Sequence, residues 1–538
     1  MKKKTYPHAT PPPLYPLSSE LNFTRRSFLI GGASFAAAAL LSNRVKGAIT
    51  TAPKFSSYPF TLGIASGDPA PDGFVLWTRL APSPLEPGGG MPADPVEVSW
   101  QVAEDERMSK IVQRGKATAT PMWGHSVHVE VEGLKPDRWY WYQFKTGSEI
   151  SGIGRTRTMP AAGVTPDRLR FAFASCAKYE VGYYTAYRHM AEEDCDLIFH
   201  LGDYIYESHD SSSPVPIRPH HTGVCMTLDQ YRARYALGKT DPDLQAAHAV
   251  APWIVTWDDH EVSNDYADAI SQDPEEEPPR EFLIRHAAAY QAYYEHMPLR
   301  RRSLPDGPDM LLYRRLNYGQ LASFNVLDTR QYRTDQPCGV KSGPPCPGVY
   351  DSAATIMGHQ QRAWLVDGLD YSKAGWNILA QQVLMGRVDF TPGPDVKIAL
   401  DKWSGYEFER RNLLRNLRDH PVANPLFLSG DIHTNWANDL TTDFDSPDAP
   451  SVAVELVCTS VTSNGDGVDK PDYTDALLKE NPFVKYHNSE RGYVRCEVTP
   501  DKCLADFRTV PYVSRRGAPI QTRASFQIDS GDPKLQRI

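Results

Sequence analysis

One segment, His200-Leu201-Gly202-Asp203-Tyr204-Ile205-Tyr206-Glu207, places a carboxylate and a phenol three residues apart. The apolar run Leu197-Ile198-Phe199 precedes it and predicts a buried strand, so Asp203 and Tyr206 follow that strand's carboxyl end. Because ligands bind at this edge of parallel sheets, the carboxylate and the phenol are candidate metal ligands. The plainer alternative is a strand and a turn, in which Gly202 supplies backbone freedom and Asp203 caps the next segment.

Three further apolar runs end in the same way. Phe171 to Ser175 leads to Cys176, Trp253 to Trp257 leads to Asp258-Asp259-His260-Glu261 and Asn264, and Leu426 to Leu428 leads to Asp431 and His433. Four strands that each deliver metal-binding residue types to one edge are hard to explain as four unrelated caps. We therefore predict a metal centre at that edge.

The predicted ligand set mixes two kinds of chemistry. Cys and Tyr favour a redox-capable transition ion such as iron, whereas Asp and Asn oxygens favour a hard divalent cation such as Ca²⁺, Mg²⁺ or Mn²⁺. More than one metal is expected, and Asp203, with two oxygens, is the natural bridge. Two ions ~3.5 to 4 Å apart would hold a hydroxide for in-line attack and neutralise phosphoryl oxygens. The predicted reaction is therefore hydrolysis of phosphate mono- or diesters.

Two side chains are predicted to act on the substrate. His260 follows an acidic ligand candidate and would orient the phosphate or protonate the departing alkoxide. Arg330, after a further predicted strand at Ala322 to Leu327, would clamp phosphate oxygens. A salt bridge from Arg330 to Asp328 or to another acid is an equally good interpretation.

The pattern of the chain changes near Met159-Pro160. Over residues 58–160, short alternating runs separated by turn residues predict a small all-β, fibronectin-like sandwich domain. Over residues 161–538, strands alternate with helices, which predicts an α/β catalytic domain with a four-layer αββα sandwich. Residues 48–57 would link the sandwich to residues 1–47. Helices are predicted at 184–193, 228–235, 243–251 and 280–296.

The amino terminus resembles an export signal. Thr24-Arg25-Arg26-Ser27-Phe28-Leu29 precedes an apolar segment, Ile30 to Leu41, that is too short to span a bilayer stably. We predict a twin-arginine signal peptide over residues 1–47, read by the twin-arginine translocase and cleaved after Gly47, with an uncleaved anchor as the alternative. The protein would then be periplasmic or secreted, exported folded, and without a transmembrane span after cleavage.

The charge of the chain bears on which partners it can bind. The formal net charge is −9, and residues 1–47 hold seven basic residues against Glu20, so the remainder is more acidic still. Such a chain is a poor candidate for binding a nucleic-acid backbone, although a nucleotide could be a substrate.

Among eight cysteines, Cys338 and Cys346 flank a loop that a disulfide could close, and a Cys496–Cys503 hairpin bridge is conceivable.

The order of these motifs resembles that of the PhoD-type alkaline phosphatases, a branch of the calcineurin-like or purple-acid-phosphatase metallophosphoesterase superfamily. The resemblance extends to the amino-terminal region and to His487-x-x-x-Arg491-Gly492-Tyr493. It implies Fe³⁺ with Ca²⁺ partners, for which Mn²⁺ or Mg²⁺ are possible substitutes. Carried over by position, it assigns Cys176, Asp203, Tyr206 and His433 to iron, with Asp203 shared, and Asp259, Asn264 and Asp431 to Ca²⁺.

Two points of the resemblance stay open. Either Asp258 or Asp259 could be the primary ligand, because adjacent residues on an extended chain point opposite ways. The segment from Ser208 to Cys225, with His209, His220 and His221, departs from the family pattern, and its histidines receive no role.

Other functions compete with a phosphatase. A phospholipase D-like phosphodiesterase could use the same metals on phospholipid or teichoic-type substrates, since the metals alone do not distinguish one ester bond from two. A secreted protein that sequesters iron or phosphate without turnover is a third hypothesis. The position of His260 beside the predicted ligands argues against that third function.

Overall fold

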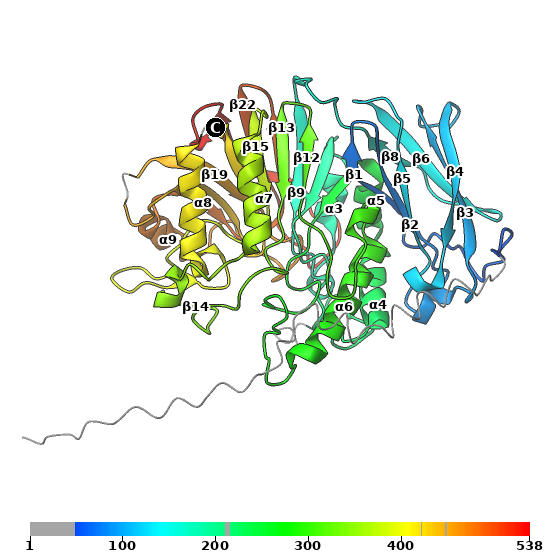
Figure 1. The fold of residues 1–538 in the computed structure, drawn as a ribbon, viewed down its shortest axis with the longest axis horizontal. Helices are drawn as coiled ribbons and strands as arrows, with labels where there is room; N and C mark the ends of the chain where they lie inside the picture. The colour runs from blue at the N-terminus through cyan, green and yellow to red at the C-terminus, as the bar shows by residue number, and fades with distance from the viewer. Residues whose placement is uncertain (1–48, 210–215, 421, 447–448) are drawn as a thin grey trace, which may run out of the picture. The chain divides into compact units, whose positions relative to one another are not determined.

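The fold is given by a computed structural model that describes residues 49–209, 216–420, 422–446 and 449–538 (Figure 1). The predicted signal peptide, residues 1–47, lies outside these residues. Within them, no helix combines the length and the apolar character that a membrane crossing requires.

The larger of two main sheets has ten strands, with the parallel strands β9, β10 and β11 near its centre. Strands from the carboxyl-terminal end of the chain extend it on one side, and strands from the amino-terminal region extend it on the other. In spatial order the strands are β24 (Gln536–Arg537), β23 (Gln521–Asp529), β22 (Lys502–Val510), β21 (Arg491–Val498), β9 (Leu169–Ala174), β10 (Leu197–His200), β11 (Trp253–Val255), β1 (Ile64–Ala70), β2 (Gly73–Arg79) and β5 (Ser126–Val131).

The second main sheet has seven strands, of which β13, β15, β17 and β19 run parallel to one another. Its spatial order is β12 (Arg314–Tyr318), β13 (Ala322–Val326), β15 (Trp376–Ala380), β17 (Pro425–Ser429), β19 (Ser451–Val457), β18 (Asn435–Thr441) and β20 (Val484–Asn488). All of the strands predicted at the four motif runs and at 322–327 are present.

Strand β9 shows why the apolar runs are continuous. Phe171 and Phe173 join a core that also contains Phe324 and Ile378 of the second sheet, whereas Ala172 and Ala174 face a different core formed with helices. Successive side chains of a strand point to opposite faces, so a strand covered on both faces must be apolar throughout.

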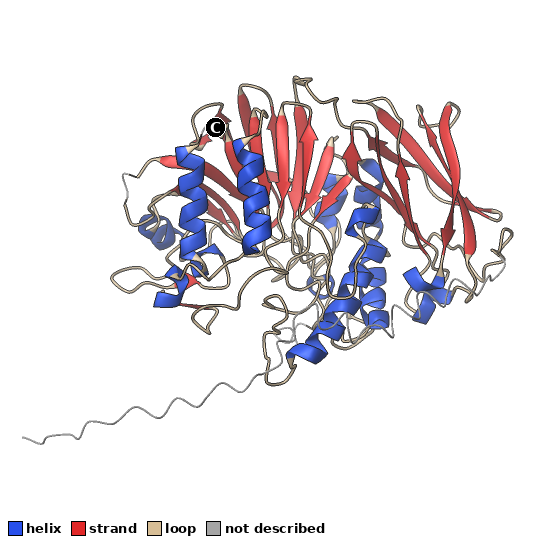
Figure 2. Cartoon of the chain, viewed as in Figure 1, coloured by secondary structure: helices blue, strands red, loops and turns tan. Residues whose placement is uncertain are grey.

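Helices cover the outer faces of both sheets (Figure 2). The core formed with β9, β10 and β11 includes side chains of α3 (Thr185–Met190), α4 (Leu228–Lys239), α5 (Pro242–Val250) and α6 (Pro279–His296). The core on the second sheet includes side chains of α7 (Gly358–Asp370) and α8 (Glu407–Asp419), and α9 (Thr474–Glu480) packs near β20. The fold is α/β, as predicted.

The amino-terminal region contributes strands to two sheets. A five-stranded sheet contains β4 (Ile111–Ala119), β3 (Val96–Ala103), β6 (Trp139–Thr146) and β7 (Glu149–Ile150), with β8 (Gly154–Arg157) beside β6. Strands β1, β2 and β5 instead continue the ten-stranded sheet, because Gly67 of β1 pairs with Trp253 of β11. A Cβ at Gly67 would lie 2.6 Å from the Trp253 carbonyl oxygen, so this approach depends on glycine.

The cysteine predictions have different outcomes. Cys338 and Cys346 form a disulfide, next to a small sheet of β14 (Ser342–Gly343) and β16 (Ile398–Ala399). The prediction of a Cys496–Cys503 bridge was wrong, because both cysteines are free and buried. The register of β21 and β22 pairs Cys496 with Ala505 and Cys503 with Val498, so the two thiols are not opposite each other.

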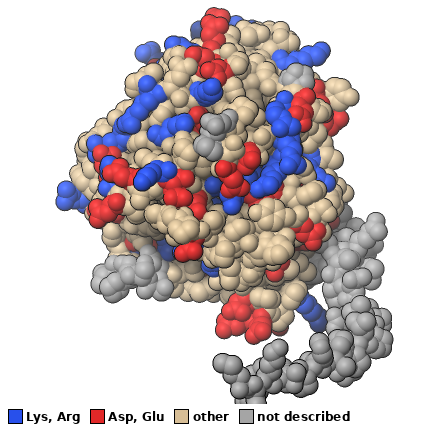
Figure 3. Space-filling model, turned by 90° about the vertical axis from the view of Figure 1, so that its left-hand side faces the viewer, with Lys and Arg blue, Asp and Glu red and all other residues tan. Residues whose placement is uncertain are grey.

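Charged side chains of both signs are interspersed on the face of the molecule that Figure 3 shows. Proteins that bind a nucleic-acid backbone cluster Lys and Arg on one face or along one helix. Among the described residues visible on this face, neither sign covers an extended area.

Candidate metal centre

The predicted ligands lie where strands of both main sheets end. The ten-stranded sheet supplies the residues after β9, β10 and β11, and the seven-stranded sheet supplies those after β17. A backbone hydrogen bond joins the loops after β9 and β10, since the Cys176 N–H donates to the Gly202 carbonyl at 3.0 Å. The residues so placed are Cys176, Asp203, Tyr206, Asp258, Asp259, His260, Asp431 and His433.

Four of the predicted ligands have a left-handed backbone. Their φ angles are 60° at Cys176, 55° at Asp203, 63° at Asp431 and 61° at His433. This conformation costs a residue other than glycine roughly 1–3 kcal/mol and persists where the surroundings impose it, often at functional sites. The chain thus turns sharply after β9, β10 and β17, and these turns direct the ligand side chains toward the sheet edge.

The residues assigned to iron lie together. Cys176, Asp203 and His433 each offer a ligand atom within 4.8 Å of the others. The Tyr206 hydroxyl donates to Asp203 Oδ2 at 2.9 Å and lies 3.1 Å from His433 Nε2. The Ser463 hydroxyl donates to the same phenol oxygen at 2.7 Å, which fixes its position. A thiol, a carboxyl, a phenol and an imidazole therefore share one small volume.

A second group contains three aspartates, Asp258, Asp259 and Asp431, whose ligand oxygens also lie within 4.8 Å of one another. Both members of the Asp258–Asp259 pair therefore face the centre. The alternation expected of an extended chain does not apply here, because the chain bends at Asp259 and turns at His260. Asp203 connects the two groups, since it also lies within 4.8 Å of ligand atoms of Asp259 and His260.

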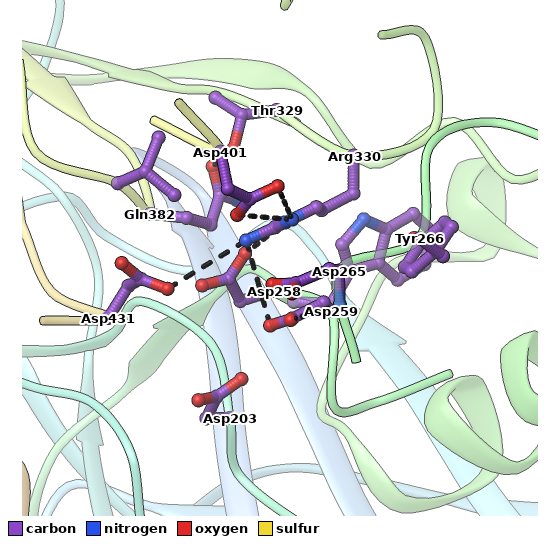
Figure 4. A network of polar contacts seen from close by, with 12 residues as sticks. Asp203, Asp258, Asp259, Asp265, Tyr266, Thr329, Arg330, Gln382, Asp401 and Asp431 are labelled. Carbon is purple, nitrogen blue, oxygen red and sulfur yellow. Dashed lines mark hydrogen bonds and ion pairs between the residues drawn. The ribbon is translucent and has the colours of Figure 1, made fainter. Parts of the chain in front are cut away.

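Arg330 lies in the middle of the aspartate group (Figure 4). Its Nε donates to Asp258 Oδ1 at 2.5 Å, and its Nη1 is 3.0 Å from Asp401 Oδ2. Its Nη2 lies 3.7 Å from Asp259 Oδ1 and 3.8 Å from Asp431 Oδ1. In this arrangement Arg330 forms the salt bridges of the alternative interpretation, although with acids other than Asp328.

His260 is held by a carboxylate. Its Nδ1 lies 2.6 Å from Glu207 Oε2, and its ring centroid is 4.1 Å from that of Tyr206. Burial alone would lower the pKa of His260, but Glu207, Asp259 and Asp203 raise it well above the usual value. These carboxylates therefore favour the protonated form of His260, which can donate a proton.

Asn264 reaches the site mainly through its backbone. Its N–H donates to Glu207 Oε1 at 3.0 Å, which anchors the turn that carries His260. Its side-chain amide donates instead to Gln272 Oε1 on the exposed side of this turn. The geometry therefore supports Asn264 less than the other predicted ligands.

The acids of this centre fit a metal site because their charge is poorly compensated. For both Cys176 and Tyr206, burial is the largest effect and the charge of Asp203 the next, and together they raise each pKa well above its usual value. The pKa of Asp203 itself is raised well above its usual value by burial and by Asp259 and Asp258. Among the described residues, Asp203 Oδ1 and Asp258 Oδ2 have no hydrogen-bond partner. Bound cations would use these oxygens and would stabilise the deprotonated forms.

We expect the affinity of the metal-free protein for Mn²⁺, a redox-stable probe, to rise with pH. Cys176 and Tyr206 hold their protons near neutrality, because burial and Asp203 raise both pKa values, and an ion must displace these protons. Affinity should increase about tenfold per pH unit for each proton displaced. Calorimetric titrations at pH 6, 7 and 8 would measure this, and equal affinities at all three would contradict it.

Comparison with known proteins identifies the family. Residues 171–507 match the family described as PhoD-like phosphatase, and residues 46–160 match its amino-terminal domain. This chain belongs to the PhoD-like phosphatases. The phosphatase is 49% identical over 525 residues to alkaline phosphatase D of Bacillus subtilis (strain 168), a match that covers 96% of this chain and 89% of the relative. It is thus a hydrolase of phosphoric esters.

One solved structure supports the same family. Described as the structure of PhoD, it matches this phosphatase with a TM-score of 0.88 and 49% identity, and the match covers 90% of this chain and 93% of that one. The structure of GAP50, the anchor in the inner membrane complex of Plasmodium, covers 69% of this chain and 91% of that chain at 12% identity. Its TM-score of 0.36 is too low to bear on function.

Several residues that shape this phosphatase's site were not predicted. Glu261 accepts backbone N–H groups of Asp203 and Asp258, each at 2.9 Å, and so joins the loops after β10 and β11. Burial, the largest effect, raises its pKa to about 8. Its place in the Asp-Asp-His-Glu run was the available signal. Arg491, from the late motif, donates to the His433 carbonyl at 2.7 Å and holds that loop.

Asp401 and Lys402 come from a loop after β16. Asp401 pairs with Arg330 Nη1 at 3.0 Å, and Lys402 forms an ion pair with Asp431. No apolar run or motif distinguishes these two residues in the sequence, so only the structure associates them with the site.

Proposed function

We propose that this PhoD-like phosphatase has alkaline phosphatase activity on phosphate mono- and diesters and uses two kinds of metal in one centre. Fe³⁺ would be held by Cys176, Asp203, Tyr206 and His433. Ca²⁺ would be held by Asp259, Asp431 and Asn264, with Asp258 as a further candidate and with Mn²⁺ or Mg²⁺ as substitutes. The proposal rests on one observation: Asp203 belongs both to the thiol–imidazole group and to a group with Asp259.

Metals bound there would supply positive charge that neutralises phosphoryl oxygens and lowers the pKa of a water nucleophile. The chain's own residues would do the rest. His260, charged and held by Glu207 at 2.6 Å, would give its proton to the departing alkoxide. Glu207 positions that imidazole. Burial alone would raise the pKa of Glu207, but His260 lowers it, so the carboxylate form of Glu207 is favoured.

Arg330 would bind the substrate phosphate through one part of its guanidinium. Its Nη2 has no hydrogen-bond partner among the described residues and faces Asp259 and Asp431. The ion pairs with Asp258 and Asp401 would fix the guanidinium plane in advance, so little side-chain freedom is lost when a phosphate oxygen binds.

Three further parts of the proposal concern the whole chain. The two family matches support an amino-terminal domain over residues 58–160 and a catalytic domain over 161–538. The separate cores on each outer sheet face and between the sheets support a four-layer αββα catalytic domain. Arg25-Arg26 before an apolar segment supports export by the twin-arginine translocase to the periplasm or beyond.

We expect chelation to abolish hydrolysis and metal return to restore it. Activity on p-nitrophenyl phosphate should fall at least ~100-fold when a chelator removes the ions, because the charge on phosphorus is then no longer neutralised. Adding Fe³⁺ and Ca²⁺ together should restore it, with chelator already saturated with Fe³⁺ as the control. Full activity after complete metal removal would contradict the proposal.

The same assay distinguishes the substrate classes. p-Nitrophenyl phosphate, its bis ester and phosphatidylcholine should be compared with one enzyme preparation at one pH. Comparable turnover of the first two supports a phosphatase of mono- and diesters. Turnover of phosphatidylcholine alone would contradict this proposal and favour the phospholipase D-like alternative.

A further inference from the structure

A second group of donors lies outside the metal centre and shares no residue with it. Glu180, His209 and His220 each offer a ligand atom, and the three atoms lie within 4.8 Å of one another. We propose that these three residues bind one divalent transition metal ion, such as Zn²⁺, separately from the catalytic ions. This ion would tie the segment around Glu180 to both described ends of the 208–225 segment, of which residues 210–215 lie outside the described part.

Two imidazoles converge on one carboxylate oxygen. His209 Nδ1 lies 3.0 Å from Glu180 Oε1, and His220 Nδ1 lies 3.4 Å from the same oxygen. The two imidazole centroids are 5.6 Å apart. Ligand atoms bound tetrahedrally at about 2.0–2.1 Å from Zn²⁺ are roughly 3.3 Å from one another. The donors therefore need only small side-chain movements to coordinate an ion.

Among the described residues, His220 is the member of this group whose ring nitrogens make no hydrogen bond. Its side chain is 1% exposed, so both nitrogens are buried. Buried polar atoms without a partner are rare, because each costs about 1–3 kcal/mol. A hydrogen bond from His209 to Glu180 accounts for those two residues, but it leaves His220 unexplained.

The protonation state of His220 favours a cation rather than a proton. Its side chain is buried, and burial disfavours the charged form of an imidazole. A neutral imidazole has one nitrogen lone pair, which is the form that binds metals. The Tyr179 ring, stacked at a centroid distance of 6.3 Å, helps to hold the imidazole in this orientation.

The donor types define the class of metal. Two imidazoles and one carboxylate suit Zn²⁺ and related transition ions, whereas Ca²⁺ and Mg²⁺ prefer oxygen ligands alone. Three protein ligands leave a fourth position of a tetrahedral ion for water or another group. This set also differs from the thiol, phenol and carboxyl set of the catalytic centre, so the two sites should select different ions.

The position of the site suggests what the ion would stabilise. Glu180 follows Cys176 by four residues, and His209 follows Tyr206 by three. Two of the three loops that carry predicted iron ligands therefore continue directly into this second site. An ion there would join the two loops beside the catalytic centre and reduce their movement.

The test uses the full protein as purified, with its catalytic metals in place, and counts additional Co²⁺ bound per chain. Co²⁺ is chosen because its visible absorption reports histidine ligands. We expect the wild type to bind one Co²⁺ more than His220→Ala, with the difference spectrum of a tetrahedral nitrogen–oxygen site. His209→Ala should lose the same ion, and because the His209 side chain is 48% exposed, this variant should fold without a core defect.

His221→Ala is the matched control, since it removes the adjacent exposed histidine, and it should retain the extra ion. Iron and calcium contents should be equal in all four proteins, so the result does not depend on whether the proposed phosphatase mechanism is correct. Equal Co²⁺ binding by the wild type, His220→Ala and His209→Ala would overturn the proposal.

Discussion

Replacing Asp203 by Asn should lower kcat/KM for p-nitrophenyl phosphate by roughly 1,000-fold or more while the chain stays folded. Asp203 is the residue common to two donor groups, and its Oδ2 also accepts the Tyr206 hydroxyl at 2.9 Å. Asn keeps the shape and one oxygen acceptor but loses the negative charge that two cations would share. Steady-state kinetics combined with iron and calcium analysis would measure the effect.

Asp194→Asn provides a matched control for this change. Asp194 also has a left-handed backbone, with φ of 49° against 55° at Asp203, so any backbone effect of Asn should be similar. Its side chain is 66% exposed and pairs with Arg155 instead of facing the site. Turnover like that of the wild type in Asp203→Asn would refute the bridging role.

Gly202→Ala should lower the free energy of unfolding by about 3 kcal/mol. A Cβ there would lie 2.4 Å from Asp258 Cβ and 2.5 Å from the Asp258 backbone nitrogen. The φ of +113° adds strain for any side chain. Because Gly202 separates β10 from Asp203, the displacement would also move Asp203 and Asp258 apart and weaken metal binding.

Urea unfolding followed by tryptophan fluorescence would measure the loss. Gly152→Ala is the control, because no heavy atom lies within 4 Å of the added Cβ and the backbone there is not left-handed. It should unfold at the wild-type urea concentration. If Gly202→Ala unfolds at the same urea concentration as the wild type, the loops after β10 and β11 are not in the close contact described.

Most of the site's location could be predicted because the strands that carry it are buried on both faces. Such strands read as short apolar runs, and each run here is followed within a few residues by a metal-binding side chain. Cys176, Asp203 and His433 could therefore be assigned to one edge before any pairing was known, and the structure brings them within 4.8 Å. The family resemblance added the identities of the ions, which remain proposals.

The rest depends on contacts between distant segments, which no local pattern records. Pairing of β1 with β11 relies on the absence of a side chain at Gly67, so the amino-terminal strands extend the catalytic sheet. Strand register decided against the Cys496–Cys503 bridge. Lys402 reaches Asp431 from a loop with no distinguishing residues.

Anomalous X-ray diffraction on either side of the iron absorption edge, from crystals of the purified enzyme, tests the central proposal most directly. We expect one iron peak roughly 2 to 2.5 Å from Cys176 Sγ, an Asp203 oxygen, the Tyr206 oxygen and a His433 nitrogen. A second peak, without an iron edge, should lie on the Asp259 and Asp431 side of Asp203. An active enzyme with no iron peak among these four side chains would contradict the account.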